Sequence, residues 1–390
     1  MELPAPRRPD INYLFTDRNY ERCNIHMAKV LILINSSGGL YDFRNEFVKA
    51  LTAEHEVYVS MPDDVKEKEL RAEGCKIIKT AINRRGINPI EDLKLYRTYV
   101  KMMKEIRPDL VVTYTIKPNI YGGYAAGRLK IPYIATITGL GGAFDRTGLL
   151  LKLVVSMYRA GLKRAACVFF QNEENRGIFR NMGIMGKKTR MVMGSGVNLE
   201  RHSYEKYPSG EETHFLFVGR VMKERGILEY IEAAKQLHSD RVFFDIMGYC
   251  DEDYQELLDR LEQEGVIKQI GFHTEVHEFL AAASAIVVAS FHEGMSNALI
   301  EGAATGRPVI ASNISGCMEA FEEGVTGFGF TPGRPEELAG AMEKFLALSI
   351  EERAAMGRCG RQKMEREFDR KLVTGEYMDE VSQILSNKKG

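Results

Sequence analysis

Residues 285–312 read AIVVASFHEGMSNALIEGAATGRPVIAS, and this stretch decides the fold class. An apolar run, Ala285–Ala289, predicts a buried strand; a helix is expected from about Ser296; and Pro308–Ala311 predicts a second strand. Strands that are apolar throughout and joined by a helix are typical of parallel pairs covered on both faces. The stretch therefore predicts an α/β protein with a doubly wound parallel sheet.

The same alternation of strand and helix extends along most of the chain. It pauses at residues 193–208, where Gly, Asn, Ser and Pro gather, and we expect a linker at residues 195–212. Two Rossmann-like domains are predicted, over residues 27–205 and 206–367. Because ligands of such sheets bind at the carboxyl ends of the strands, the predicted site lies between the domains. The other predicted strands are Lys29–Asn35, Glu56–Val59, Asp109–Thr113, Tyr133–Ile137, Val168–Phe170, His214–Val218 and Arg241–Met247.

The composition is that of a folded protein. Of 390 residues, 44% are hydrophobic and 27% are charged, which is ordinary for a globular protein. No apolar run reaches the about 18 residues of a membrane-spanning helix. Residues 1–26 contain no apolar signal segment and are predicted to be a disordered extension. Six cysteines show neither metal nor redox spacing, which favours the reducing cytoplasm.

Positive charge is concentrated in the first half of the chain. Residues 1–200 hold 32 Lys and Arg against 21 Asp and Glu, whereas residues 201–390 hold 21 against 33. A basic half suits nucleic acid, an anionic membrane or a phosphorylated substrate, and a solvated face explains it too. We disfavour nucleic acid, because no zinc-finger spacing or aromatic–basic RNA motif is present. The basic stretch 149–166 fits either a membrane interface or a core helix with a basic outer face.

Two acids and several small residues follow the first strand of the opening stretch. Gly294 lets a ligand approach the backbone, and the N–H groups of a helix starting near Ser296 attract phosphate. Glu301 lies on the early turns of that helix, where it can accept hydrogen bonds from two ribose hydroxyls. Glu293 can do the same for the hydroxyls of a sugar. Taken alone, a capped surface helix with two solvated acids explains these residues more simply.

A second motif, residues 215–234, reads FLFVGRVMKERGILEYIEAA. A predicted strand leads directly to Arg220, and Arg225 comes just before a predicted helix. Two guanidinium groups beside the end of a strand suit a diphosphate, since each can make bidentate contacts with its oxygens. On its own this motif is weak.

Together, the two motifs resemble those of the family-4 retaining glycosyltransferases, which have the GT-B fold. In that family two acids separated by seven residues define the donor site, and Glu293 and Glu301 have this spacing. The family's basic pair maps onto Arg220 and Arg225, although the second position is usually Lys. The resemblance also implies a C-terminal helix, residues 368–390, that crosses back onto the N-terminal domain.

Segments of the N-terminal half are similar to those of one bacterial subgroup. They are Gly38–Arg44, Lys117-Pro118-Asn119 and Thr138-Gly139-Leu140-Gly141. The subgroup includes the N-acetylgalactosaminyltransferase that extends a polyprenyl-diphosphate-linked saccharide. The resemblance implies Lys117, Asn119 and Thr138 as acceptor-binding residues, although many family members have His where this chain has Thr138.

The resemblance implies a donor and a role for each site residue. The donor is a UDP-sugar, with GalNAc or a related hexose as the sugar, and neither a metal ion nor another cofactor is needed. Arg220 and Arg225 neutralise the departing diphosphate. Glu293 orients the sugar and Glu301 holds the ribose. The other donor-binding residues are Gly38 and Gly39 near the phosphates, Gly271 and Phe272 at the base, and Gly294, Met295, Ser296 and Asn297 at the helix start.

Three consecutive acids, Asp251-Glu252-Asp253, have the spacing of the DxD motif of metal-dependent glycosyltransferases. They open a predicted helical stretch. We therefore expect them to cap that helix and balance its dipole, and not to bind a metal.

The sequence leaves several functions open. The first hypothesis is a cytoplasmic glycosyltransferase, peripheral on the inner face of the cytoplasmic membrane, that extends a lipid-linked saccharide of a cell-surface glycan. A second keeps the activity but uses a soluble acceptor. A third is a non-catalytic subunit that binds a nucleotide sugar, and a fourth is a nucleotide-sugar epimerase of the same fold, which would consume the donor without an acceptor.

Overall fold

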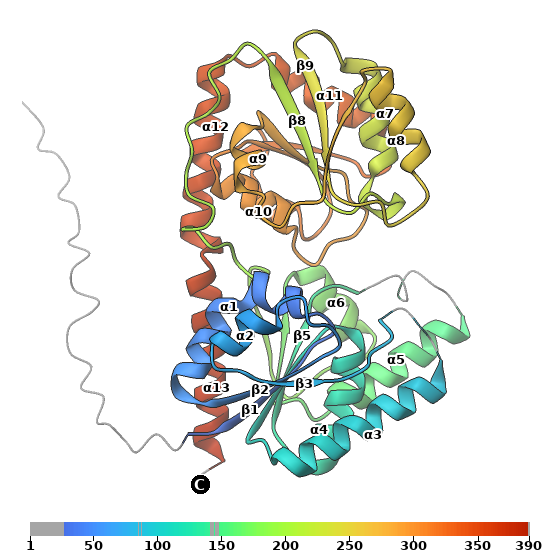
Figure 1. Ribbon diagram of the computed structural model, residues 1–390, viewed down its shortest axis with the longest axis vertical. Helices are drawn as coiled ribbons and strands as arrows, with labels where there is room; N and C mark the ends of the chain where they lie inside the picture. The colour runs from blue at the N-terminus through green and yellow to red at the C-terminus, as the bar shows by residue number, and fades with distance from the viewer. Residues whose placement is uncertain (1–26, 85, 87, 141–143, 145–147, 389–390) are drawn as a thin grey trace, which may run out of the picture.

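The computed structural model of the protein contains two α/β domains that follow one another along its long axis (Figure 1). It describes residues 27–388 apart from 85, 87, 141–143 and 145–147, so the predicted extension, residues 1–26, lies outside the described residues. Each domain is built on a parallel sheet with helices on both faces. This confirms the predicted α/β class of two facing Rossmann-like domains.

The first domain is built on a seven-stranded sheet in the order β3-β2-β1-β4-β5-β6-β7. Its central strands are buried on both faces, which explains why they are apolar along their whole length. The strands are β1 (Lys29–Leu33), β2 (Glu56–Met61), β3 (Lys76–Lys79), β4 (Leu110–Tyr114), β5 (Tyr133–Ile137), β6 (Cys167–Phe170) and β7 (Thr189–Met191). The helices are α1 (Ser37–Glu54), α2 (Glu67–Ala72), α3 (Pro89–Ile106), α4 (Gly123–Leu129), α5 (Leu149–Leu162) and α6 (Glu173–Asn181).

The second domain has a six-stranded sheet in the order β10-β9-β8-β11-β12-β13. The strands are β8 (Thr213–Val218), β9 (Val242–Met247), β10 (Lys268–Gly271), β11 (Ala285–Val288), β12 (Val309–Ser312) and β13 (Gly327–Phe330). The helices are α7 (Ile227–Leu237), α8 (Gln255–Gln263), α9 (His277–Ala282), α10 (Asn297–Ala304), α11 (Pro335–Leu346) and α12 (Ile350–Lys363). Strands β8 and β11, which precede the two predicted donor motifs, are direct neighbours.

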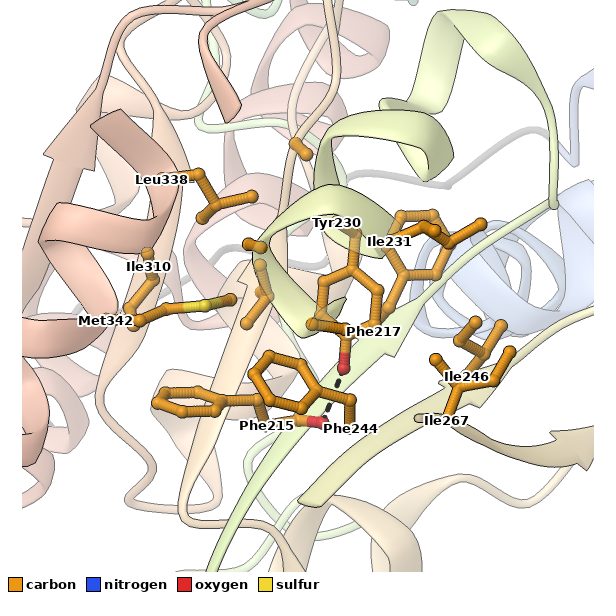
Figure 2. Packing of buried hydrophobic residues seen from close by; sticks show 14 of the residues in the cluster. Phe215, Phe217, Tyr230, Ile231, Phe244, Ile246, Ile267, Ile310, Leu338 and Met342 are labelled. Atoms are coloured by element: carbon orange, nitrogen blue, oxygen red, sulfur yellow. Dashed lines mark hydrogen bonds between the residues drawn. The ribbon is translucent and has the colours of Figure 1, made fainter. Parts of the chain in front are cut away.

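An aromatic core fixes one face of the second sheet. Phe215, Phe217 and Phe244 on β8 and β9 pack against Tyr230 on α7, and Figure 2 shows these rings with their aliphatic neighbours. The buried hydroxyl of Tyr230 donates hydrogen bonds to the carbonyl oxygens of Phe215, at 2.7 Å, and Asp245, at 3.0 Å. The Tyr230 hydroxyl is therefore paired inside the core, and it ties α7 to both β8 and β9.

The chain passes between the domains twice, and the two crossings lie against each other. Val197 forms a parallel bridge with Asp369, and its N–H donates to the carbonyl oxygen of Phe368 at 2.8 Å. Gly196 has a φ of 66°, and a side chain there would overlap the backbone of Arg370. After the second crossing, α13 (Arg370–Asn387) packs on the first domain, so that α12 and α13 run as a rod along both domains (Figure 1).

Arg307 fastens the linker between the domains to the second domain. Its side chain is fully buried and donates hydrogen bonds to the carbonyl oxygens of Ala281, at 2.8 Å, Glu205, at 3.1 Å, and Lys206, at 2.8 Å. We expect Arg307→Met to lower the free energy of unfolding of the second domain by about 3 kcal/mol, because buried carbonyl groups lose their donors. Urea denaturation measures this; a loss no larger than that of the exposed control Arg241→Met, about 0.5 kcal/mol or less, would contradict it.

Candidate active site

The predicted donor motif lies at the carboxyl end of the second sheet. Glu293 and Gly294 stand in the loop after β11, and α10 begins at Asn297 with Ser296 as its N-cap. No side chain in the described part of the protein caps this helix, and the N–H of Ser296 donates to the carbonyl oxygen of Gly316 at 2.8 Å. The N–H groups of the first helical turn are thus left for a ligand, and with the helix dipole they favour an anion.

A sharp turn brings Arg225 beside Glu293. Gly226, the next residue, has a φ of 72°, and a side chain there would overlap the carbonyl oxygen of Ala289 at the end of β11. Arg225 forms an ion pair with Glu293, and the hydroxyl of Ser290 donates to the same carboxylate at 3.0 Å. The Glu293 side chain is only 10% exposed and that of Arg225 is 29% exposed. The pair is therefore largely shielded from solvent, with part of the Arg225 side chain open to a ligand.

Arg220 supplies a second cation close by. Its Nη1 lies 2.5 Å from Oδ2 of Asp251, and the Arg220 side chain is 36% exposed. Burial lowers the pKa of the Arg225 guanidinium, and the positive charge of Arg220 lowers it further. The two positive charges therefore repel each other, and the binding of an anion would reduce this repulsion.

The three acids after β9 do not cap a helix, and two of them, Asp251 and Glu252, contact the turn after β8. Helix α8 begins at Gln255 with Tyr254 as its N-cap, so the prediction that residues 251–253 cap it is wrong. Glu252 instead accepts a hydrogen bond from the N–H of Lys223 at 2.8 Å. Asp251 and Glu252 therefore fix the turn between β8 and α7, which the sequence pattern alone did not reveal because their partners, Arg220 and Lys223, lie in a distant part of the sequence.

Glu301 lies inside α10 among charged groups from both domains. Its Oε1 is 3.8 Å from Nε2 of His202, and the charges of Arg370, Arg201 and Asp42 act on it. Burial raises the pKa of the Glu301 carboxyl to about 7, against the opposite effect of the two arginines. The pKa of His202 is lowered to about 3, chiefly by burial, so its imidazole is neutral. Glu301 therefore titrates near neutral pH.

An exposed aromatic pair marks the ends of β9 and β10. Phe272 is 63% exposed, and its ring lies 5.7 Å from that of Tyr249, which is 47% exposed. Gly271, with a φ of 81°, turns the chain just before Phe272. Tyr249 was not predicted from the sequence, although its place directly after a strand and Gly248 is a signal for such a residue. Exposed rings at the strand ends suit contact with a planar base.

The start of α1 faces the donor motif from the first domain. Gly38 and Gly39 form the first turn of α1, and the hydroxyl of Ser36 accepts a hydrogen bond from the N–H of Gly39 at 3.3 Å. Burial raises the pKa of Asp42 on the same helix, and its charge acts on Glu301 across the domain boundary. The predicted phosphate contacts of Gly38 and Gly39 stay a prediction.

Of the predicted acceptor residues, Thr138 lies at the domain boundary. A side chain at Gly294 would overlap the carbonyl oxygen of Thr138, so the close approach of the two domains requires glycine there. Gly141, from the same predicted segment, lies outside the described residues. Thr138 is therefore in contact with the donor loop itself.

Lys117 and Asn119 are engaged in contacts within the first domain. Nζ of Lys117 lies 2.6 Å from Oδ1 of Asp92, and both side chains are largely buried. Asn119 is 1% exposed; it accepts a hydrogen bond from Thr113 at 2.7 Å and donates one to the carbonyl oxygen of Thr136 at 2.8 Å. These bonds join β4 to β5, and acceptor binding by Lys117 and Asn119 stays a prediction.

Two contacts between the domains were not predicted. The hydroxyl of Ser195 donates to Oδ1 of Asn297 at 2.9 Å, and Nδ2 of Asn172 donates to the carbonyl oxygen of Gly294 at 2.7 Å. Met295 is buried in a hydrophobic cluster of the second domain with residues of β11 and α10, so it anchors the loop to that domain. The first domain thus touches the donor motif at several points.

Comparisons with known proteins agree with this arrangement. The family model described as glycosyl transferases group 1 matches residues 201–363, and the one described as glycosyl transferase 4-like matches residues 29–172. The chain is 25% identical over 379 residues to N,N'-diacetylbacillosaminyl-diphospho-undecaprenol alpha-1,3-N-acetylgalactosaminyltransferase of Campylobacter jejuni, covering 92% of this chain and 100% of that protein. It is 28% identical over 258 residues to UDP-Gal:alpha-D-GlcNAc-diphosphoundecaprenol alpha-1,3-galactosyltransferase of Escherichia coli, covering 60% of this chain and 65% of that protein.

Solved structures show the same fold. Anabaena HepE in complex with UDP-glucose matches with a TM-score of 0.77 at 20% identity, covering 91% of this chain and 100% of that chain. Sucrose-phosphate synthase from Thermosynechococcus elongatus matches with a TM-score of 0.76 at 17% identity, covering 92% and 100%. The two family models fall on the two domains in turn: one covers β1 to β6 of the first sheet and the other covers all strands of the second. The chain therefore matches the glycosyl transferase 4-like model in its first domain and the glycosyl transferases group 1 model in its second, and it is a glycosyltransferase of GT-B fold.

Proposed function

We propose that this glycosyltransferase moves a sugar from a UDP-sugar to a polyprenyl-diphosphate-linked saccharide, with retention of the anomeric configuration. The ion pair of Arg225 with Glu293, beside the open start of α10, carries this proposal. As the sugar–phosphate bond breaks, negative charge grows on the diphosphate. Arg220, Arg225 and the helix dipole then stabilise the transition state more than the bound donor, which is the requirement for catalysis.

Each remaining group of the site has one task in this proposal. When the diphosphate takes over part of the Arg225 guanidinium, Glu293 is free to accept hydrogen bonds from the sugar hydroxyls. Glu301 holds the ribose, and the Tyr249–Phe272 pair takes the base. The arginines do the work that a divalent cation does in other transferases, so the proposed reaction needs neither a metal ion nor a cofactor besides the nucleotide sugar. The leaving phosphate accepts the proton of the attacking hydroxyl on the same face, which gives retention.

The identities of donor and acceptor draw support from the relatives. Both bacterial relatives are named for undecaprenyl-diphosphate-linked substrates, one transferring N-acetylgalactosamine and the other galactose from UDP-Gal. Capsular polysaccharide and lipopolysaccharide core glycosyltransferases also match. We propose GalNAc or a related hexose as the sugar and a cell-surface glycan as the product.

A lipid-linked acceptor implies contact with the membrane. Leu153 on α5 is 56% exposed, and the same helix carries Lys152 and Arg159. Residues 101–200 hold 16 basic against 6 acidic residues, which suits an anionic leaflet. Within the described ranges, no helix has both the length and the apolar character to span a bilayer. We propose a peripheral position on the inner face of the cytoplasmic membrane, with α5 toward the lipid.

Nucleotide release by the purified protein tests the proposal. A panel of nucleotide sugars is incubated in EDTA, with and without lipid-linked glycans extracted from bacterial membranes. We expect UDP release from one donor, dependent on the lipid. Turnover with soluble sugars only would favour the soluble-acceptor alternative, and donor conversion without an acceptor would favour the epimerase. Failure to bind any nucleotide would overturn the enzyme proposal.

The proposed role of Glu301 predicts a dependence on pH. We expect KM for the nucleotide sugar to rise about tenfold as the pH falls by two units from about 8, because Glu301, with a pKa of about 7, must be ionised to accept bonds from the ribose. Initial rates at several donor concentrations measure this. Glu301→Gln is expected to give a flat profile; an equally steep one in that variant would show that another group titrates.

A further inference from the structure

Asn172 joins the two domains through a single amide group. It follows β6 as the N-cap of α6, where its Oδ1 accepts a hydrogen bond from the N–H of Asn175 at 2.8 Å. Its Nδ2 donates to the carbonyl oxygen of Gly294 at 2.7 Å and to that of Glu293 at 3.3 Å. The residue is 1% exposed, so these bonds are shielded from water. One side chain thus caps a helix of the first domain and holds the donor loop of the second.

The donor loop has little freedom where Asn172 holds it. A side chain at Gly294 would overlap the carbonyl oxygen of Thr138 and come within 2.9 Å of Oε1 of Gln171. The residues that follow β5 and β6 in the first domain therefore lie in close contact with the donor loop. Because the carbonyl groups held by Asn172 belong to Glu293 and Gly294, the contact fixes the backbone that carries the Glu293 carboxylate.

We infer that Asn172 is a positioning residue: it couples the approach of the two domains to the placement of Glu293. The inference rests on the role of Glu293 in the proposed function. When the domains separate, the two carbonyl groups lose their donor and the loop is released; when they meet, the amide restores one geometry of the loop. Arg220 and Arg225 lie wholly in the second domain, so binding of the diphosphate does not require this contact, whereas transfer does.

Asn172→Asp tests the two functions of the amide separately, because it keeps the oxygen that caps α6 and removes the N–H groups that contact the donor loop. Aspartate caps a helix as well as asparagine does, so α6 keeps its N-cap. It has no N–H to offer, and its carboxylate would meet the two carbonyl groups of the donor loop, a repulsive and buried contact. Asn172→Ala loses both the cap and the cross-domain bonds. Ser349→Ala, which removes the cap of α12 away from the site, is the control for loss of a cap alone.

The kinetic test compares turnover with nucleotide binding. We expect Asn172→Asp to lower kcat for transfer by about 10- to 100-fold while the Kd for UDP stays close to that of the wild type, because the repulsion moves the donor loop away from the first domain and leaves the diphosphate groups of the second domain in place. Ser349→Ala is expected to lower the melting temperature without this loss of kcat. If Asn172→Asp turns over as fast as the wild type, or loses UDP binding along with stability, the positioning role is overturned.

Hydrogen exchange of the UDP-bound protein gives a readout that does not depend on turnover. We expect Asn172→Asp to speed exchange in the donor loop, residues 290–296, while α6 keeps its protection because its cap is intact. Unchanged exchange in the loop would overturn the inference even if the protein has no transferase activity. A wild type that binds UDP but transfers nothing, with the loop loosened by Asn172→Asp, would count against the proposed function and for the coupling.

Discussion

Replacing Glu293 by glutamine is expected to lower kcat for transfer by about 100- to 1,000-fold while leaving UDP binding nearly unchanged. Glutamine keeps the shape of the side chain but loses the negative charge that pairs with Arg225 and faces the sugar. The loss falls on kcat because, in the proposed function, the carboxylate orients the sugar for transfer and does not contact the nucleotide. UDP release at saturating donor, together with calorimetric titration of UDP, measures both quantities.

The matched control is an acid of the same domain that lies away from the site. Glu336 at the start of α11 is 63% exposed in its side chain, and Glu336→Gln is expected to leave kcat as in the wild type. A Glu293→Gln protein with a wild-type kcat would show that the sugar is oriented by other groups. Loss of UDP binding in that protein would instead place Glu293 at the nucleotide.

Arg225 is expected to tolerate lysine but not glutamine. Arg225→Gln removes the cation beside Glu293 and leaves that carboxylate, which is only 10% exposed, without its charged partner. We therefore expect kcat/KM to fall by about 100- to 1,000-fold. Arg225→Lys keeps the charge, although as a point charge that cannot make a bidentate contact, and should stay within about tenfold of the wild type. Steady-state kinetics on both variants and the melting temperature of each give the comparison.

Equal activity of the two Arg225 variants would show that charge at this position does not stabilise the leaving group. If Arg225→Gln loses activity and its melting temperature also falls sharply, the cause would be the Glu293 carboxylate left without its cationic partner. In that case the double variant Arg225→Gln with Glu293→Gln should recover stability but not activity, since it removes the unpaired charge while leaving the diphosphate without its cation.

The central strands were predictable from the sequence and the edge strands were not. Runs such as Tyr133–Ile137 are buried on both faces, so they are apolar along their whole length, and this pattern is visible without a structure. The missed strands are the four at the sheet edges: Lys76–Lys79, Thr189–Met191, Lys268–Gly271 and Gly327–Phe330. An edge strand has one open side and needs fewer apolar residues, so KIIK and KQIG resemble loops.

The local geometry of the candidate site was predictable where its residues are close together in the sequence. Glu293, Glu301 and the start of α10 belong to one strand–loop–helix unit, whose local geometry follows from its pattern. Asn172 and Tyr249 belong to other units and reach the same place only through the folded sheets. Nothing in the sequence around Lys117 indicates that its Nζ lies 2.6 Å from Oδ1 of Asp92 on α3. Contacts of this kind depend on packing between elements distant in sequence.

The position of α13 has a consequence for the order in which the chain folds during synthesis. Val373, Tyr377 and Val381 of this helix belong to the core of the first domain, together with residues of β1 and α1, which come before the second domain in the sequence. The ribosome makes this helix only after the second domain, so the first domain cannot complete its core until the second domain has been synthesised. The sheet of the second domain lies within one continuous segment and can form earlier. The half made first is therefore the half completed last, and its exposed apolar face is the part of the nascent chain that chaperones must protect longest.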